Sequence, residues 1–271
     1  MTESAAALRA RYGAAVPAAA IPWNPALDLL LSHRSVRAYR PDPLPEGTLE
    51  ALVAAAQSAA TSSNMQAWSV VAVTDPDSKR RLAAVAGGQR HVEQCPLLLV
   101  FLADLSRHAR LAERTGRPLE GLPFLETFLV AALDAGLAAQ NAVVAAESLG
   151  LGTVYIGALR NDVEAVAEEL GLPPGAVAVF GLCVGHAAPD GGAVKPRLPQ
   201  AAVLHHGRYD PEADMLALPG YDAALEAFSR GQERSPYTWT QRAMARWGTL
   251  RAMAGRDRLR EALERLGFPL R

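Results

Sequence analysis

Five short segments hold the residues best suited to chemistry in this 271-residue sequence. The first spans residues 33–37 and places an imidazole, a hydroxyl and two guanidiniums within five positions, on His33, Arg34, Ser35 and Arg37. Guanidinium groups bind phosphates and other planar anions through paired hydrogen bonds. The cluster therefore suits an anionic ligand, although a solvated charged turn explains the same residues equally well.

A second cationic cluster contains Lys195 and Arg197, which flank Pro196. It follows an apolar run at residues 177–187, and Pro196 and Pro199 restrict its backbone. Two cations on a stiff loop near a strand end suit a ligand phosphate. A plain basic loop is an equal alternative.

Two clusters offer hydrogen bonds without charge. Thr61, Ser62 and Ser63 begin a run of donors and acceptors that suits the edge of a heteroaromatic ring, although a simple polar turn explains them more economically. Gln89 follows a pair of glycines at 87–88 and can present a donor and an acceptor to a pyrimidine-like edge. Taken alone, the glycines are typical of a helix C-cap.

The fifth cluster lies at the end of an apolar run. Backbone N–H groups and small residues there let a flat ring lie against the chain, and the strand ends of open sheets are common ligand positions. The residues are Tyr155, Ile156, Gly157 and Ala158.

Composition excludes several classes of function. The 27 basic and 28 acidic residues leave a net charge of −1, so nothing draws the whole chain to nucleic acid or to an anionic membrane. Cys95 and Cys183 both lie in apolar runs, which predicts buried thiols, and no cysteine–histidine spacing indicates a metal. No uninterrupted apolar run reaches membrane-spanning length and no signal peptide is recognisable, so we expect a cytoplasmic protein.

The elements that position these clusters are four apolar strands interleaved with helices. Strands are predicted at residues 68–75, 96–104, 152–157 and 177–187, and the second is apolar throughout, as in a strand buried on both faces. The pattern predicts a layered α/β or α+β sheet with helices on both faces. No G-x-G-x-x-G follows a strand, so a Rossmann fold is unsupported and cationic side chains must hold any phosphate.

Several helices are also predicted. Residues 48–60 form an amphipathic helix with Thr48 as its N-cap, and residues 125–152 form a helix apolar nearly all round, which indicates burial in the core or in an interface. A further helix at 158–172 ends at Gly171. His91 and His108 lie in charged helical contexts that predict surface positions.

The ordered set of motifs resembles one known family. Residues 27–242 carry, in order, HRSVR, TSSNMQ, GGQRHV, AAQNAVVAAESLGLGTVYIGALRND, VFGLCVGHA and KPRLP. This order resembles the flavin reductase and oxygen-insensitive NADPH nitroreductase branch, group A, of the nitroreductase superfamily. The resemblance implies an α+β sandwich with a central, mainly antiparallel sheet flanked by helices, formed as an intertwined homodimer. It also implies FMN at the dimer interface.

The resemblance assigns roles to the clusters. Lys195 and Arg197 match the pair that binds the FMN phosphate with Ser35, and Arg37 lies near the N1/O2 edge of the flavin. The remaining FMN contacts implied are His33, Arg34, the turn Thr61, Ser62 and Ser63 from the other subunit, Gln89, and the segment Tyr155, Ile156, Gly157 and Ala158.

The tail resembles the NADPH-binding segment of the same family. SRGQERSPYTWT, residues 229–240, makes Arg230 the first candidate for the adenosine 2′-phosphate and Arg234 the second. A later family arginine matches either Arg251 or Arg256, which leaves NADPH over NADH preference open. Asn64 stands where relatives can be apolar.

The implied organisation is an N-terminal arm at 1–26, an FMN-binding core at 27–210 and a C-terminal helical excursion at 211–271 that contributes to the NADPH site. The implied function is an NAD(P)H oxidoreductase that passes hydride through FMN to nitroaromatic, quinone or flavin acceptors by a ping-pong mechanism. The alternatives are an FMN enzyme with a specialised biosynthetic or oxidative reaction, and a non-catalytic flavin-binding protein.

Overall fold

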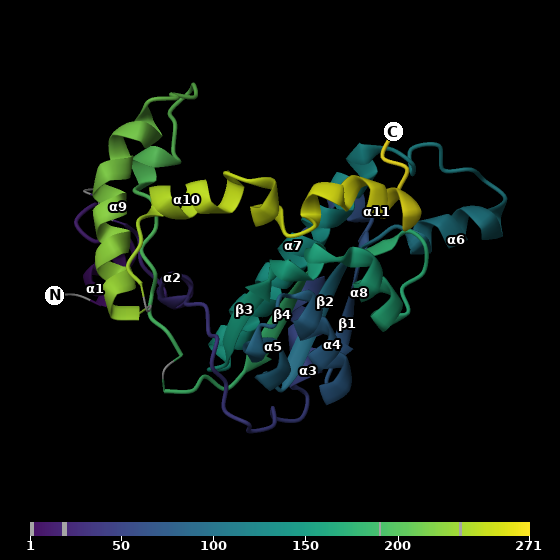
Figure 1. Cartoon of the computed structure of the whole chain (residues 1–271), viewed down its shortest axis with the longest axis horizontal. Coiled ribbons are helices and arrows are strands. Elements are labelled where there is room, and N and C mark those ends of the chain that lie inside the picture. The colour runs from purple at the N-terminus through teal and green to yellow at the C-terminus, as the bar shows by residue number, and fades with distance from the viewer. Residues whose placement is uncertain (1–2, 18–20, 190, 233–234) are drawn as a thin grey trace. The chain divides into compact units, whose positions relative to one another are not determined.

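The computed structural model describes residues 3–17, 21–189, 191–232 and 235–271, whose helices and strands are labelled in Figure 1. The chain divides into two compact units. The first unit comprises residues 1–35 and 192–252, and the second comprises residues 36–191 and 253–271. Each unit contains some of the predicted clusters.

Within the described residues, the second unit contains a four-stranded antiparallel sheet in the order β1-β2-β4-β3. The strands are β1 (Trp68–Val73), β2 (Leu97–Asp104), β3 (Gly152–Ile156) and β4 (Ala176–Gly185). Phe101 faces Phe180 across the central pair, and the register then shifts by one residue at a bulge. The four predicted strands and the mainly antiparallel α+β fold are confirmed.

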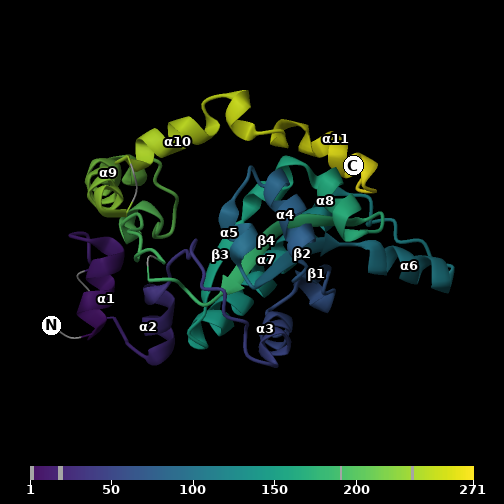
Figure 2. The same cartoon turned by 60° about the horizontal axis from the view of Figure 1, so that its bottom comes forward.

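The central strand β2 is buried along its whole length, as its continuous apolar run predicts. Alternate side chains enter two separate cores because successive residues of a strand point to opposite faces. Leu99 and Phe101 pack with α3 (Thr48–Gln57) and α7 (Leu125–Ser148). Leu98 and Val100 pack with α4 (Pro76–Val85), α5 (Arg90–Gln94) and α8 (Val163–Leu170). Figure 2 shows α3 on one side of the sheet and α4 and α8 on the other.

The long helix α7 has two apolar faces. A row of alanines, including Ala131, Ala135 and Ala142, is fully or almost fully buried and lets the helix approach the sheet closely. The other face exposes four leucines at intervals of four residues, here called the leucine stripe: Leu125, Leu129, Leu133 and Leu137. Among the described helices, α7 is also the one long and apolar enough to span a membrane by length and composition, a test that core helices of globular proteins pass as well.

Two predicted helix boundaries are wrong in detail. Gly47, not Thr48, is the N-cap of α3, and its φ of 79° is a left-handed conformation that favours glycine. The Thr48 hydroxyl does not cap the helix but donates to the Pro45 carbonyl. Residues 157–161 form a 3₁₀ turn, and α8 begins only at Val163, where Asp162 caps it through the backbone N–H of Ala165. The predicted end of this helix at Gly171 is confirmed.

Among the described residues, the remaining α-helices of the second unit are α6 (Ser106–Thr115) and α11 (Leu259–Arg265). Helix α11 returns the end of the chain to this unit and buries Leu263 with Phe268 beside α8. The first unit contains α1 (Glu3–Tyr12), α2 (Pro25–Ser32), α9 (Ala213–Gln232) and α10 (Trp239–Trp247). A capping box between Thr238 and Gln241 starts α10.

Candidate functional site

In the first unit, the structure joins the two cationic clusters through Arg11 of α1. Arg11 is 6% exposed, and its guanidinium donates to the carbonyls of Lys195 at 2.8 Å, Leu31 at 2.6 Å and His33 at 2.8 Å. The backbone N–H of Arg197 donates in return to the Arg11 carbonyl at 2.9 Å. Segments that lie about 160 positions apart in the sequence are therefore held side by side.

Two further hydrogen bonds hold the side chains of this cationic region in place. Arg34 Nη1 donates to the Gly192 carbonyl at 3.0 Å. Gly192 has a φ of 87°, and a Cβ there would lie 3.2 Å from the Ser35 carbonyl oxygen, so a side chain would strain this contact. Lys195 Nζ donates to the Tyr237 hydroxyl at 3.0 Å. The region gathers positive charge beside a hydroxyl, which is the chemistry of an anion site.

In the second unit, Arg37 follows a tightly fixed residue. Val36 is 1% exposed, its N–H donates to the Thr153 carbonyl at 2.8 Å, and a Cβ on Gly152 would lie only 2.6 Å from its side chain. Arg37 itself is exposed. The pKa of the His91 imidazole is lowered by burial and, to a smaller extent, by the positive charge of Arg37.

Gln89 lies at the start of α5, after a glycine pair that ends α4. Gly87 and Gly88 have φ values of 78° and 74°, and their N–H groups donate to the Ala84 and Ala83 carbonyls, so the helix C-cap reading is confirmed. Gln89 Nε2 donates to the Ala86 carbonyl at 2.9 Å. This bond fixes the amide and leaves Oε1 as the atom suited to a ligand.

The polar turn at residues 61–67 is held in an uncommon conformation. Ser63, Asn64 and Gln66 have φ values of 48°, 57° and 49°. The left-handed region costs a non-glycine residue about 1–2 kcal/mol each. Ser62 and Ser63 are exposed, whereas the Thr61 hydroxyl lies between two protein groups: it donates to Asp134 Oδ2 at 2.8 Å and accepts from the Gln66 N–H at 2.9 Å.

Helix α6 holds the same turn from another side. Arg107 Nη1 donates to the Gln66 carbonyl at 2.9 Å, and His108 Nε2 lies 3.1 Å from the Met65 carbonyl. Because a carbonyl only accepts, this contact requires the Nε2–H form of His108. The predicted surface position of this histidine is wrong, since it is half-buried against the turn.

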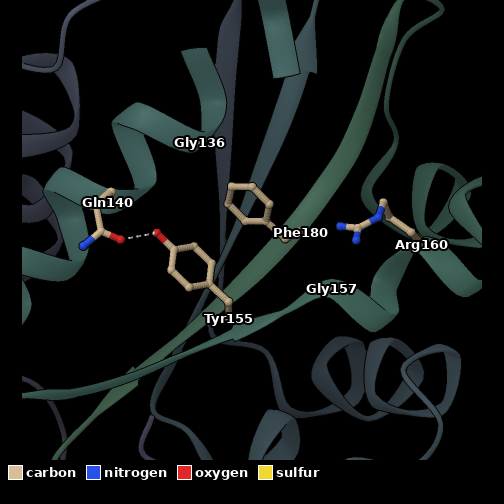
Figure 3. A pocket seen from close by; sticks show the side chains of 6 residues that line it. All are labelled: Gly136, Gln140, Tyr155, Gly157, Arg160 and Phe180. Carbon is tan, nitrogen blue, oxygen red and sulfur yellow. Dashed lines mark hydrogen bonds between the residues drawn. The ribbon is translucent and has the colours of Figure 1, made fainter. Parts of the chain in front are cut away.

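The segment that begins at Tyr155 forms one wall of a pocket of about 310 Å³. Figure 3 shows the Tyr155 ring edge-on to Phe180, with its hydroxyl donating to Gln140 Oε1 at 3.3 Å. Burial, followed by the charge of Glu147, raises the pKa of Tyr155, so the phenol stays protonated. The pocket is lined by Gly136, Gln140, Tyr155, Gly157, Arg160 and Phe180.

Arg160 folds over the glycine of this segment. Its Nη1 donates to the Val179 carbonyl, and a Cβ on Gly157 would lie 3.3 Å from its Nη2. Ile156 is 1% exposed, packs in the core and is not among the residues that line the pocket. Ala158 is half-buried. Of this segment, Tyr155 and Gly157 therefore line the pocket, and its role as a ring contact stays a prediction.

Comparison with known proteins identifies the fold. The model of the nitroreductase family matches residues 30–186, and the model of the C-terminal domain of that family matches residues 195–271. The chain belongs to the nitroreductase family. It is similar to the FMN reductase (NADPH) of Bacillus subtilis (strain 168), with 40% identity over 226 residues that cover 82% of this chain and 90% of the relative.

Other family members confirm the same branch. The oxygen-insensitive NADPH nitroreductase of Salmonella typhimurium is 39% identical over 219 residues, covering 80% of this chain and 88% of the relative. The structure of NfrA2 from B. megaterium has a TM-score of 0.86 at 38% identity and covers 92% of this chain and 100% of the other. An NADPH:FMN oxidoreductase from Vibrio harveyi, complexed with NAD+, has a TM-score of 0.81 at 34% identity, with 92% and 100% coverage.

In the nitroreductase C-terminal domain, the candidate arginines differ in their partners. Arg230 lies on α9 and forms an exposed ion pair with Glu226 at 2.6 Å. Arg251 is exposed in the same unit. Arg256 belongs to the second unit, where its Nε donates to Asn161 Oδ1 at 2.9 Å. Arg234 lies outside the described residues.

Sequence reasoning missed two buried charged residues, Arg11 and Asp134, that hold segments of the candidate site in place. Arg11 sits in an alanine-rich helix with no motif around it. Asp134 is a lone acid in the middle of the apolar helix α7, and it accepts hydrogen bonds from the turn at residues 61–67. A solitary carboxylate in such a helix is itself a signal, because a buried charge needs dedicated donors.

The two cysteines are buried thiols, as predicted. The hydrogen bond with Cys95 first, and burial second, raise the pKa of Cys183. Within the part of the chain that the structure describes, no group of three or more histidine, cysteine or acidic side chains is placed to hold a metal ion.

Proposed function

We propose that this nitroreductase-family protein is an FMN-dependent NADPH oxidoreductase that reduces nitroaromatic, quinone or free flavin acceptors. Its relatives include proteins named FMN reductase (NADPH), oxygen-insensitive NADPH nitroreductase and NADPH-flavin oxidoreductase. The observation that carries the proposal is the joining of the two cationic clusters by Arg11, because a cofactor phosphate needs both and the sequence has no phosphate-binding glycine loop.

The residues of each unit fit parts of FMN. In the first unit, His33, Arg34, Ser35, Lys195 and Arg197 offer the charges and hydroxyl that bind a phosphate. In the second unit, the proposed ring contacts are the exposed serines of the turn, Oε1 of the fixed glutamine amide and the segment at 155–158, of which Tyr155 and Gly157 line the pocket: Ser62, Ser63, Gln89, Tyr155, Ile156, Gly157 and Ala158.

Arg37 supplies the electrostatic contribution proposed for the reaction. When bound, FMN supplies the hydride chemistry that no side chain of this protein has. A guanidinium at the N1/O2 edge favours the negative charge that reduction brings there, and it acts without a proton transfer. NADPH and the acceptor are proposed to use one pocket in turn, so initial-rate plots should give the parallel lines of ping-pong kinetics.

Arg230 is proposed to bind the 2′-phosphate of NADPH. Its present partner, Glu226, holds it in an exposed ion pair, which is a weak interaction that a phosphate can displace. Arg251 is favoured over Arg256 as a second contact, because Arg256 Nε is committed to Asn161. Arg234 stays a candidate from the sequence alone.

A homodimer is proposed because a second copy of the chain would bury the solvent-exposed leucine stripe of α7. Leu125, Leu129, Leu133 and Leu137 are each 48–58% exposed on one helix face. An aligned apolar row of this kind marks an association surface, and a second copy of the chain is the occupant that the family resemblance implies. We also propose a cytoplasmic location, because both cysteines are free thiols and the cytoplasm keeps thiols reduced.

The test is turnover with a matched pair of arginine variants. The FMN-loaded protein should oxidise NADPH in the presence of menadione. Arg197→Ala should raise the FMN Kd about tenfold or more, because it removes a charged phosphate contact. Arg208→Ala removes another exposed arginine of the same unit and should leave the Kd unchanged. Bound FMN without NADPH turnover would overturn the proposal.

A further inference from the structure

A buried carboxylate lies beneath the polar turn of the second unit. Asp134, in the middle of α7, is 2% exposed. Its Oδ1 accepts from the Ser62 N–H at 3.0 Å, and its Oδ2 accepts from the Thr61 hydroxyl at 2.8 Å and from the Ala67 N–H at 3.2 Å. Desolvating a carboxylate is costly unless donors surround it. Here all three donors come from one turn.

These hydrogen bonds close both ends of the turn. Between Ser62 and Ala67, three non-glycine residues have positive φ: Ser63, Asn64 and Gln66. Residues persist in such conformations only when their surroundings fix them. Asp134 supplies that restraint directly at the two ends. It also acts through Thr61, whose hydroxyl accepts from the Gln66 N–H.

The Thr61 hydroxyl is thereby used as a donor and as an acceptor within the protein. Its one proton goes to Asp134, so none remains for a ligand. Ser62 and Ser63 have exposed side chains on the same turn. Thr61 therefore stabilises the conformation of the turn, whereas the side chains of Ser62 and Ser63 remain available to a ligand.

Helix α7 supports a second segment of the proposed flavin site as well. Gln140, six residues after Asp134, accepts from the Tyr155 hydroxyl and lines the pocket of Figure 3. Asn141 Nδ2 donates to the Ala55 carbonyl at 3.1 Å, which fixes α3 shortly before the turn begins. One helix thus sets the positions of two segments that lie far apart in the sequence.

We propose that Asp134 is a positioning residue for FMN binding: it holds the turn in the strained form that presents Ser62 and Ser63 to the cofactor of the partner subunit. The inference rests on the proposed function. It assigns Thr61 to the support of the turn and the two serines to the ligand.

The first test replaces Asp134 with asparagine. An amide offers one acceptor oxygen and an NH₂ group, so at least one of the three donors loses its partner. We expect the FMN Kd of the full-length apoprotein, measured by quenching of flavin fluorescence, to rise about tenfold. The matched control is Asp104→Asn, which alters another buried carboxylate whose side chain is bonded to Ser69 and Ser106 outside the turn.

A double-mutant cycle separates positioning from general destabilisation. If Asp134 acts on FMN through the serines, Asp134→Asn added to Ser62→Ala/Ser63→Ala should raise the Kd little further, because coupled residues are non-additive. Asp104→Asn should lower the thermal midpoint but leave the FMN Kd within about twofold of wild type. Independent, additive effects of Asp134→Asn and the serine variants would overturn the inference.

Thr61 provides a second, milder variant. Thr61→Val removes the hydroxyl and should raise the FMN Kd in the same direction, while Thr61→Ser keeps it and should restore binding. If Asp134→Asn does not fold, the FMN Kd values of Thr61→Val and Thr61→Ser test the positioning role instead. Wild-type Kd values in folded Asp134→Asn or Thr61→Val would overturn the inference alone. A wild-type protein that binds no FMN would overturn the proposed function and this inference with it.

Discussion

Arg11 provides a sharp test of how the first unit builds its anion site. The guanidinium makes three hydrogen bonds to backbone carbonyls, those of Leu31, His33 and Lys195. Hydrogen bonds that involve a charged group contribute about 1.5–3 kcal/mol each, and water replaces part of that when the side chain is removed. We therefore expect Arg11→Ala to destabilise this unit by roughly 2–4 kcal/mol.

The same change should weaken FMN binding although Arg11 is not assigned to the ligand. Without it, the segments at 33–35 and 195–197 must be ordered when the phosphate binds, and such a loss of preorganisation should raise the Kd about tenfold. Arg11→Lys should be intermediate, because an ammonium lacks the forked donors that reach several carbonyls.

The assay combines thermal unfolding of the full chain with titration of the apoprotein by FMN. Arg9→Ala is the matched control, since Arg9 is an exposed arginine on the same helix. It should leave both quantities unchanged. If Arg11→Ala keeps the unfolding midpoint and the FMN Kd of wild type, Arg11 does not assemble the site.

Three further predictions follow from other contacts. Arg230→Ala should raise the KM for NADPH about tenfold and leave that for NADH unchanged, because it removes only a proposed 2′-phosphate contact; equal effects on both would contradict the assignment. Leu133→Glu places a charge in the leucine stripe, where Leu133 is 58% exposed, and should give a monomer in equilibrium sedimentation, whereas an unchanged dimer would exclude this face. His91 has a pKa lowered from its ordinary value of 6.5 by burial and by Arg37, so the folded state favours the neutral ring. That contribution to stability is present above pH 6.5 and is lost as the pH falls from 6.5 through the pKa of the folded state. His91→Gln should therefore flatten the pH dependence of the unfolding midpoint over that range.

The strands and most helices could be predicted because their signals are local. The apolar run at residues 97–104 requires burial on both faces, and β2 is buried throughout. Glycine pairs such as Gly87–Gly88 end helices by a backbone geometry that other residues resist. Thr48 was misassigned because threonine is a common N-cap, whereas a left-handed glycine before it takes that position.

The candidate site residues can be found in the sequence as clusters, whereas the residues that hold those clusters in place cannot. Motifs show which side chains have suitable chemistry, as for Lys195 and Gln89. They do not show which distant residue holds a segment in place, because that depends on tertiary contacts. Arg11 and Asp134 have no neighbours in sequence that mark them, and each becomes meaningful only when the carbonyls or N–H groups around it are known.

The decisive experiment for an FMN-dependent NADPH oxidoreductase is the absorbance spectrum of the purified protein, followed by an anaerobic titration with NADPH. We expect flavin bands that bleach as NADPH is added, which would establish the cofactor and its reduction by NADPH in one experiment. Flavin bands that resist NADPH but bleach with dithionite would contradict the proposed reductase activity and favour a specialised FMN enzyme. A colourless protein that cannot be reconstituted with FMN would contradict the account as a whole.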